Sequence, residues 1–292
     1  MKPDVAFPIW SGERAQRVAA VLDGCLPPAG EPPQTLHQAM HYSVLSGGKR
    51  VRAMLAYAAG EFAGAEPNVV DAAAAAVELI HAYSLIHDDL PCMDDDVLRR
   101  GRPACHVAYG EAMALLAGDA LQALAFEVLA KAHLPGGIAV LARSAGSRGM
   151  AGGQAFDLAS TGAALALDEL ERMHRLKTGA LIGAAVRLGA ACGPPLSAEQ
   201  ERALDRCASA VGLAFQVVDD VLDVEGTAQS LGKTAGKDAA QQKPTYVSVL
   251  GLAAARELVL KLRAEAHSAL AGSGAAARRL GEIVDWLTAR SN

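Results

Sequence analysis

Aromatic residues are scarce in this chain: they make up 4% of its 292 residues, whereas hydrophobic residues make up 51% and charged residues 20%. The high apolar share excludes an intrinsically disordered chain. β-Branched residues occur only in short runs, and alanine, the strongest helix former, is abundant, as in the run Ala72–Ala76. The composition therefore predicts an all-α protein, and the length is enough to bury a sizeable core.

An excess of basic residues is also missing. The chain has 27 Lys and Arg against 32 Asp and Glu, which gives a formal net charge of −5. Proteins that bind nucleic acids owe much of their affinity to basic side chains on phosphates, so we expect no nucleic-acid partner. The net charge does not exclude a small anionic ligand, because local clusters of charge decide that.

Cysteine pairs, a leader segment and a long apolar run are absent as well. The odd number of scattered cysteines without a CxxC pair predicts reduced, buried thiols in a cytoplasmic protein; they are Cys25, Cys92, Cys105, Cys192 and Cys207. The first residues lack the apolar core of a signal peptide. No stretch reaches the roughly 18 uncharged apolar residues of a membrane span, so we expect none; the nearest, 69–86, contains Asp71, Glu78 and His81.

Helical periodicity dominates the chain and shows no domain boundary, so we expect one domain over residues 1–292. The Ser197–Gln200 and Asp168–Glu171 spacings are typical of capping boxes at helix starts. A polar, lysine-rich segment at 226–244 separates two strong helices and is a candidate lid. The expected helices cover residues 11–25, 34–46, 50–64, 69–90, 105–131, 136–160, 168–175, 177–192, 198–224, 240–271 and 274–290.

Two acidic clusters stand at the ends of apolar helices. The first has five aspartates within residues 88–96, and the helical projection places His81, Ser84 and Asp88 on one face. Carboxylates at a helix C-terminus repel each other and oppose the helix dipole, which indicates a compensating cation. Magnesium suits such a cluster because it shares carboxylates with substrate phosphates.

The second cluster lies in residues 215–223, where the other positions are apolar. Gln216, Asp219, Asp220 and Asp223 fall within a stripe of roughly 100° on one helix. A polar stripe on an otherwise apolar helix must face a cavity or a cation. Two DDxxD-like clusters, on helices about 130 residues apart, predict facing carboxylates that hold several Mg²⁺ ions and a diphosphate.

Four basic clusters accompany the acidic ones. Glycines and helix starts beside cations favour bound anions, so we expect two phosphorylated ligands, one held through metal and one by side chains alone. The clusters are GGKRVR at 47–52, RRGR at 99–102, KTG at 177–179, and the lysines at 233, 237 and 243.

Several longer motifs together resemble the trans-isoprenyl diphosphate synthase (polyprenyl synthetase) family, and most of all its bacterial farnesyl diphosphate synthases. They are GGKRVR, IHAYSLIHDDLPCMDDDVLRRGRPACH, GDALQALAF, GGQAFDL, HRLKTGAL, GLAFQVVDDVLD and LGKTAGKD, in the order of the family, from about Tyr42 to Tyr246. The resemblance implies a single all-α domain whose helices surround a deep central cavity, usually as a homodimer. Ala53 departs from the proline of the relatives' GGKRLRP, and we expect little consequence.

The resemblance also implies the site. Asp88 and Asp94 of the first motif and Asp219 of the second would bind about three Mg²⁺, with Mn²⁺ as an alternative metal. Arg99, Lys177 and Lys233 would hold the allylic diphosphate. Thr178 and Gln216 would line the reacting centre. The isopentenyl diphosphate would be held without metal by Lys49, Arg52, His81 and Arg100.

The implied reaction is Mg²⁺-dependent head-to-tail condensation of isopentenyl diphosphate with dimethylallyl and geranyl diphosphates, giving farnesyl diphosphate. In the family, the positions four and five before the first aspartate-rich motif set product length, and these are Ser84 and Tyr83 here. The bulky Tyr83 beside the small Ser84 is similar to the pattern found in family members whose products stop at fifteen carbons. Geranyl and geranylgeranyl diphosphate stay open as products.

Two other classes of protein share these features in part. A terpene cyclase has the helical fold and metal-bound aspartates, but it needs neither GGKRVR nor the intact second DDxxD. A non-catalytic partner subunit of a synthase is expected to have lost one of the two aspartate motifs, and both are complete here.

Overall fold

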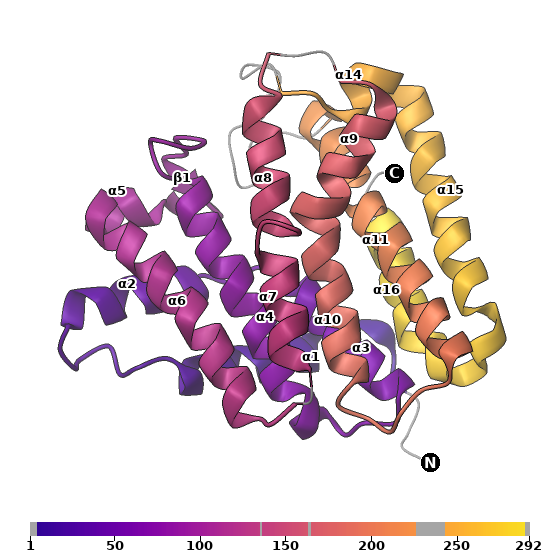
Figure 1. Cartoon of the computed structure of the whole chain (residues 1–292), viewed down its shortest axis with the longest axis horizontal. Coiled ribbons are helices and arrows are strands. Elements are labelled where there is room, and N and C mark those ends of the chain that lie inside the picture. Colours follow the sequence, from indigo (N-terminus) through magenta and orange to yellow (C-terminus); the bar gives the residue numbers. More distant parts are fainter. Residues whose placement is uncertain (1–4, 135, 163–164, 226–242, 290–292) are drawn as a thin grey trace.

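The computed structural model describes residues 5–134, 136–162, 165–225 and 243–289, and these form a helical assembly (Figure 1). The predicted all-α class is confirmed, with one addition: β1 (Leu98–Arg99) and β2 (Arg102–Pro103) pair as a short antiparallel hairpin. The helices are α1 (Phe7–Cys25), α2 (Gln34–Val44), α3 (Val51–Phe62), α4 (Pro67–Asp88), α5 (Cys105–Tyr109), α6 (Glu111–Lys131), α7 (Gly137–Ala145), α8 (Met150–Ala159), α9 (Leu167–His174), the π-helix Arg175–Gly179, α10 (Ala180–Ala190), α11 (Ala198–Glu225), α14 (Tyr246–Leu250), α15 (Leu252–Leu270), the 3₁₀ helix Ala271–Ala277 and α16 (Arg278–Thr288).

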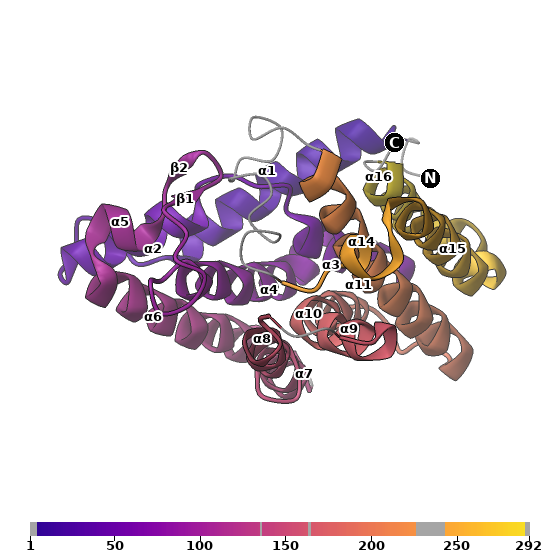
Figure 2. The ribbon, with the colours of Figure 1, turned by 90° about the horizontal axis from the view of Figure 1, so that it is seen from above.

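The core is centred on α4, which packs against α3, α6 and α10 (Figure 2). Residues Ala73–Ala76 are almost completely buried, and α3 is buried along nearly its whole length. Alanine side chains add little bulk, so neighbouring helices approach α4 closely on several sides. The composition that predicts helices also explains the dense packing around the helix that carries the first acidic cluster.

A second apolar cluster joins α11 to α15, α14 and α9. Leu213, Val217 and Val221 of α11 pack there, on the side away from its acidic stripe. This packing fixes the rotation of α11 about its axis. Asp219 of the acidic stripe therefore lines the same cavity as Asp88 of α4 and Lys177 of the π-helix.

Three of the expected helices are each divided in two. Gly110 and Gly251 adopt φ values of 86° and 82°, which L side chains rarely adopt, and they separate α5 from α6 and α14 from α15. The segment between Gly146 and Gly149 separates α7 from α8. The alanine-rich periodicity continues across these glycines, so the sequence predicts one helix where the backbone turns.

One of the two predicted capping boxes is confirmed. Ser197 and Gln200 cap each other's backbone N–H groups at the start of α11. The expected Asp168–Glu171 box is wrong. The helix begins earlier, and the carboxylate of Glu169 accepts a hydrogen bond from the Ala166 N–H at 3.0 Å.

All five cysteines are free thiols, as expected, but the expected burial is wrong for one of them. Cys105 and Cys207 are buried, and Cys25 and Cys192 are half-buried. Cys92 is exposed, because it lies in the loop that carries the first acidic cluster rather than on a helix.

Two helices, α4 and α6, are long and apolar enough to cross a membrane by length and composition alone. In α4, 67% of the most apolar window is buried inside the protein, which is typical of a core helix; in α6 the share is 39%. Both pack within the helical assembly, and α6 lies against α4, α2 and α5.

The packing around α10 makes a matched pair of glycine substitutions informative. A Cβ atom at Gly189 would lie 2.0 Å from the carbonyl oxygen of Ala56, whereas one at Gly183 meets nothing within 4 Å. We expect Gly189→Ala to lower the free energy of unfolding by about 1–3 kcal/mol. Gly183→Ala should raise it by up to about 1 kcal/mol, because alanine favours the helix. Equal effects in chemical denaturation would contradict this description of the α3–α10 contact.

Candidate active site

Two adjoining cavities lie where α4, α8, the π-helix and α11 meet. The carboxylate cavity measures about 200 Å³ and is lined by Leu85, Asp88, Asp94, Asp96, Arg99, Asp157, His174, Lys177, Gln216, Asp219, Asp220, Lys243, Pro244 and Thr245. The apolar cavity measures about 370 Å³ and is lined by Arg52, His81, Tyr83, Ser84, Leu85, His87, Asp88, Met93, Met150, Ala151, Gln154, Ala155, Leu158, Lys177 and Thr178. Leu85, Asp88 and Lys177 line both, so a charged compartment opens beside an apolar one.

The aspartates of the first cluster divide into two kinds. Asp89 is buried and accepts hydrogen bonds from Arg99 Nε at 3.0 and 3.2 Å. Asp88, the last residue of α4, and Asp94 line the carboxylate cavity instead. The motif therefore presents its first and last carboxylates to the cavity and commits the second to holding Arg99.

The second cluster divides in the same way. Asp219 lines the carboxylate cavity. Asp220 is buried and accepts hydrogen bonds from Gln216 Nε2 and from the Tyr246 backbone N–H, both at 2.8 Å. Asp223 is buried and does not line the cavity. Asp220 thus ties α11 to α14 while it also lines the cavity, so the predicted polar stripe turns Gln216, Asp219 and Asp220 toward the cavity.

Lys177 and Thr178 lie on the π-helix rather than on an α-helix as expected. Lys177 Nζ is 2.5 Å from Asp157 Oδ2 of α8, and Thr178 Oγ1 donates to Gln216 Oε1 of α11 at 3.2 Å. Gly153 lets α8 pass close to this turn, because a Cβ atom there would lie 2.1 Å from the Lys177 backbone nitrogen. π-Helical turns are frequent at functional sites.

Two residues at this site were given no individual role from the sequence, although Lys243 was counted in one of the four basic clusters. Asp157 belongs to the GGQAFDL motif, which entered the sequence analysis only as part of the family resemblance. Lys243 closes the polar segment and lies 2.8 Å from Asp94 and 3.8 Å from Asp157. The sequence could not show that Asp157 lines a cavity, because the residues that contact Asp157 lie on other elements. Lys233 and the rest of the candidate lid up to residue 242 lie outside the described residues.

Burial and charge perturb the titration of the carboxylate cavity. Burial raises the pKa of Asp88 to about 6, although Lys177 acts in the opposite direction. Burial also tends to raise the pKa of Asp157, but Lys177 and Lys243 outweigh it and the net pKa is lowered. Burial and then Lys177 lower the pKa of His174 to about 4, so its imidazole is neutral at pH 7. The cavity thus holds a desolvated carboxylate beside fixed cations.

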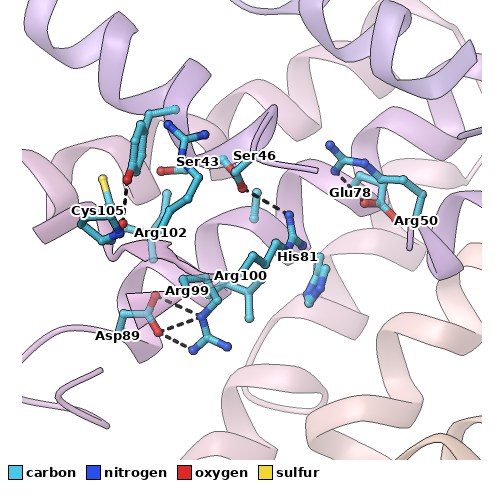
Figure 3. Close-up of a pocket in the computed structure, with 15 residues that line it drawn as sticks. Ser43, Ser46, Arg50, Glu78, His81, Asp89, Arg99, Arg100, Arg102 and Cys105 are labelled. Atoms are coloured by element: carbon cyan, nitrogen blue, oxygen red, sulfur yellow. Dashed lines mark hydrogen bonds and ion pairs between the residues drawn. The ribbon is translucent and has the colours of Figure 1, made fainter. Parts of the chain in front are cut away.

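A small third pocket of about 30 Å³, which we call the arginine pocket, lies behind the first cluster (Figure 3). Figure 3 shows Arg99 directed at Asp89 and Arg50 paired with Glu78. Arg100 of the hairpin reaches the carbonyl oxygen of Gly47 and the Ser46 hydroxyl. The lining is Tyr42, Ser43, Ser46, Arg50, Glu78, His81, Ala82, Leu85, Ile86, Asp89, Arg99, Arg100, Arg102, Pro103 and Cys105.

The lining of this pocket has four arginines against two acidic residues, Glu78 and Asp89. Burial lowers the pKa of His81 well below its ordinary value, and Arg52, Arg100, Arg99 and Arg50 lower it further. His81 lines both the arginine pocket and the apolar cavity, and Arg52 lines the latter. Lys49 is exposed and lines none of the three spaces, so the structure gathers three of the four residues expected to bind the second diphosphate.

Glu78 is the buried counter-charge beneath this basic group. Its carboxylate accepts hydrogen bonds from Arg50 and from the Ala53 backbone N–H, both at 3.1 Å. The second bond explains how this chain uses alanine at the position where relatives carry proline, since proline has no N–H to donate. Ala53 satisfies one of the free N–H groups at the start of α3 with a carboxylate from α4.

The donor set fits magnesium shared with a substrate. Within the described ranges, no three His, Cys, Asp or Glu side chains converge closely enough to hold a metal ion by themselves. Asp88 and Asp94 enter the carboxylate cavity from one side and Asp219 from α11. Mg²⁺ usually keeps waters and takes only one or two carboxylates together with phosphate oxygens. Separate carboxylates around one cavity therefore suit Mg²⁺ ions whose remaining ligands come from a diphosphate.

Comparisons with known proteins agree on the family. A family model described as polyprenyl synthetase matches residues 33–273. The chain is 52% identical to the farnesyl diphosphate synthase of Escherichia coli over 80% of this chain and 81% of that protein. It is 45% identical to a chloroplastic geranylgeranyl pyrophosphate synthase of Capsicum annuum over 98% of this chain and 79% of that protein. A geranyltransferase structure from Helicobacter pylori, complexed with magnesium and isoprenyl diphosphate, superposes with a TM-score of 0.84, 31% identity and 98% coverage of both chains.

The helical fold and the two aspartate clusters around one cavity agree with the comparisons, which give the class as isoprenyl diphosphate synthases. The chain belongs to the polyprenyl synthetase family. It is a trans-prenyltransferase that makes short-chain products and binds isoprenyl diphosphate substrates.

The Glu78 contacts predict a large effect on stability. Glu78→Ala leaves the buried Arg50 guanidinium without its carboxylate, and we expect the free energy of unfolding to fall by about 3–5 kcal/mol. Asp205→Ala removes the partner of the exposed Arg187 and should cost no more than about 1 kcal/mol. Similar losses for both variants in urea denaturation would show that burial of the Arg50–Glu78 pair does not matter.

The raised pKa of Asp88 predicts a dependence of stability on pH. Because the folded protein binds this proton more tightly than the unfolded chain, ionised Asp88 opposes folding at high pH, and its protonation relieves this as the pH falls through about 6. Asp88→Asn should therefore stabilise the metal-free protein at pH 8 by up to about 3 kcal/mol, with little effect near pH 4. A carboxyl ¹³C titration that places Asp88 near its ordinary pKa would refute this.

Proposed function

We propose that the chain is a farnesyl diphosphate synthase, which condenses isopentenyl diphosphate first with dimethylallyl and then with geranyl diphosphate. The observation that carries this proposal is the apolar cavity, in which Tyr83 and Ser84 lie side by side in the lining. Helical projection alone placed Tyr83 about 140° away from the face of Asp88. In the fold, its ring packs at 5.7 Å from that of His87 at the cavity wall. A bulky side chain there limits the length of chain that the cavity accepts.

The proposed position of the allylic substrate follows from the continuity of the two cavities. Its diphosphate would occupy the carboxylate cavity, with Asp88, Asp94 and Asp219 holding about three Mg²⁺ and with Arg99, Lys177 and Lys233 as cationic partners. Bound magnesium would neutralise charge that builds on the departing diphosphate. Its hydrocarbon tail would enter the apolar cavity past Leu85, which lines both spaces.

The second substrate would bind without metal. Arg52, His81 and Arg100, together with Lys49 at the exposed turn, would hold the diphosphate of isopentenyl diphosphate. Neutral His81 can donate a hydrogen bond to phosphate, and the surrounding arginines supply the charge. Glu78 fixes the start of α3 from which Arg52 projects, and this preorganisation lowers the cost of binding.

The reacting carbons would meet at Thr178 and Gln216, which join the two cavities. Thr178 Oγ1 donates a hydrogen bond to Gln216 Oε1, and in this proposal their oxygens would lie beside the bond that breaks. These dipoles would stabilise positive charge on the allylic carbons without donating a nucleophile. After the new carbon–carbon bond forms, the proton leaves the isopentenyl-derived carbon, and the released diphosphate is the base within reach.

We propose two further properties, a homodimer and a cytoplasmic location. The first is implied by the family resemblance. The second is supported by bacterial relatives such as that of Escherichia coli, whereas the Capsicum annuum relative is chloroplastic.

Geranylgeranyl diphosphate is the second candidate product, because a geranylgeranyl pyrophosphate synthase matches 98% of this chain. The deciding test incubates purified protein with isopentenyl and dimethylallyl diphosphates and Mg²⁺, removes the phosphates and identifies the alcohols by gas chromatography and mass spectrometry. Farnesol as the main alcohol is the expected result. Geranylgeraniol or geraniol would overturn the product assignment. The absence of any Mg²⁺-dependent alcohol from folded protein would favour the non-catalytic subunit.

Truncation of Tyr83 tests the role of the cavity wall. Tyr83→Ala should shift the main product from farnesyl toward geranylgeranyl diphosphate, because the truncation enlarges the apolar cavity. Tyr109→Ala, on α5 outside the cavity lining, serves as the control and should leave the product distribution unchanged. An unchanged distribution in folded Tyr83→Ala would remove Tyr83 as the limit to chain length.

A further inference from the structure

A pocket of about 230 Å³ lies outside the transferase site, where the end of α7 meets α10 and α11. It shares no lining residue with the three spaces described above. Figure 2 shows α7 on the side of the molecule formed by α8, α9 and α10. We propose that this pocket, which we call the outer pocket, binds a small multiply charged anion of the phosphate class.

Charge is the first argument. The lining contains four arginines contributed by four different segments: Arg143 of α7, Arg148 of the α7–α8 loop, Arg175 of the π-helix and Arg187 of α10. Asp205 is the one acidic residue of the lining among the described residues. All four arginines are exposed to solvent, and a cleft lined by one sign of charge raises the local concentration of small anions even in a chain with a net charge of −5.

The hydrogen bonds of these arginines give the second argument. Arg187 Nε donates to Asp205 at 2.8 Å, and Arg175 donates to the Ser209 hydroxyl at 2.6 Å and contacts Glu171 at 3.5 Å. Within the part of the chain that the structure describes, Arg143 and Arg148 have neither a hydrogen bond nor an ion pair. The guanidinium groups of Arg143 and Arg148 thus line the pocket with N–H donors that no described protein group accepts from. The paired N–H groups of a guanidinium match the spacing of oxygens in phosphate-type anions.

The rest of the lining leaves room for such a ligand. Gly179 and Gly183 contribute backbone to the pocket, and a Cβ atom at Gly183 would meet nothing within 4 Å. Ser144 and Ser209 add hydroxyl groups that can donate to oxyanions. The pocket is apolar only at Ala180 and Ala208, so it suits a compact oxyanion better than a hydrocarbon.

The pocket also shares a structural element with the transferase site. Arg175 and Gly179 are the two ends of the π-helix and line the outer pocket. Lys177 and Thr178, between them, line the cavities on the other side. An anion held by Arg175 therefore restrains the turn that positions Lys177, and amide exchange in this turn slows when the anion binds.

The test uses arginine labelling that is resolved by residue. The full chain, kept free of metal with EDTA and at fixed ionic strength, reacts with phenylglyoxal with or without inorganic diphosphate, and peptide mass spectrometry follows each arginine. Diphosphate at about ten times its dissociation constant should slow labelling of Arg143 and Arg148 by roughly tenfold, because about nine molecules in ten then hold the anion. Arg52 and Arg100 in the same sample report separately on the proposed substrate site.

Two matched variants distinguish binding of diphosphate in the outer pocket from general attraction of the anion to surface arginines. Arg187→Ser should weaken binding by about tenfold, so that at the same diphosphate concentration the protection of Arg143 and Arg148 falls to about twofold. Arg202→Ser removes the same charge from an exposed position of α11 outside the pocket and should leave the protection intact. Labelling rates of Arg143 and Arg148 that do not change with diphosphate would overturn the proposal. An equal loss of protection in both variants would overturn it as well. Unchanged amide exchange over residues 175–179 would overturn the coupling to the π-helix.

Discussion

The constraint on which this protein depends is the pairing of like-charged groups with counter-ions inside a helical core. Charges that leave water are costly unless a partner meets them with good geometry. The structure meets this requirement with Asp89 on Arg99, Asp157 on Lys177 and Glu78 on Arg50. These paired residues hold their neighbours in place, so that Asp88, Asp94 and Asp219 reach the carboxylate cavity while Arg52 and His81 reach the spaces on its other side.

Small residues make this arrangement possible. Alanine along α4 lets α3, α6 and α10 approach the helix that ends in the first aspartates. Gly153 lets α8 pass against the backbone of Lys177, and Gly48 leaves room for the Arg100 guanidinium, which a Cβ atom there would approach to 2.7 Å. The abundance of alanine and glycine therefore serves the site as much as the core.

Periodicity predicted most of the helices and the polar stripe of α11, because it acts within one element. The choice of Asp88 and Asp94 from the first acidic cluster came from the family resemblance, and both line the carboxylate cavity. The sequence failed where the outcome depends on contacts between elements. The breaks at Gly110 and Gly251, the π-helix at Lys177 and the pairing of Lys243 with Asp94 are examples. Ala53 shows the same limit: a substitution that appeared neutral in the sequence provides an N–H for Glu78 of another helix.

The account rests on two diphosphate sites of different chemistry, one formed by carboxylates and metal and one formed by basic side chains. Calorimetric titration with and without EDTA tests this most directly, with isopentenyl diphosphate as one ligand and an unreactive thiolo analogue of dimethylallyl diphosphate as the other. We predict that EDTA abolishes binding of the analogue and leaves the affinity for isopentenyl diphosphate within about twofold. Loss of both ligands on removal of Mg²⁺, or retention of both, would contradict the account.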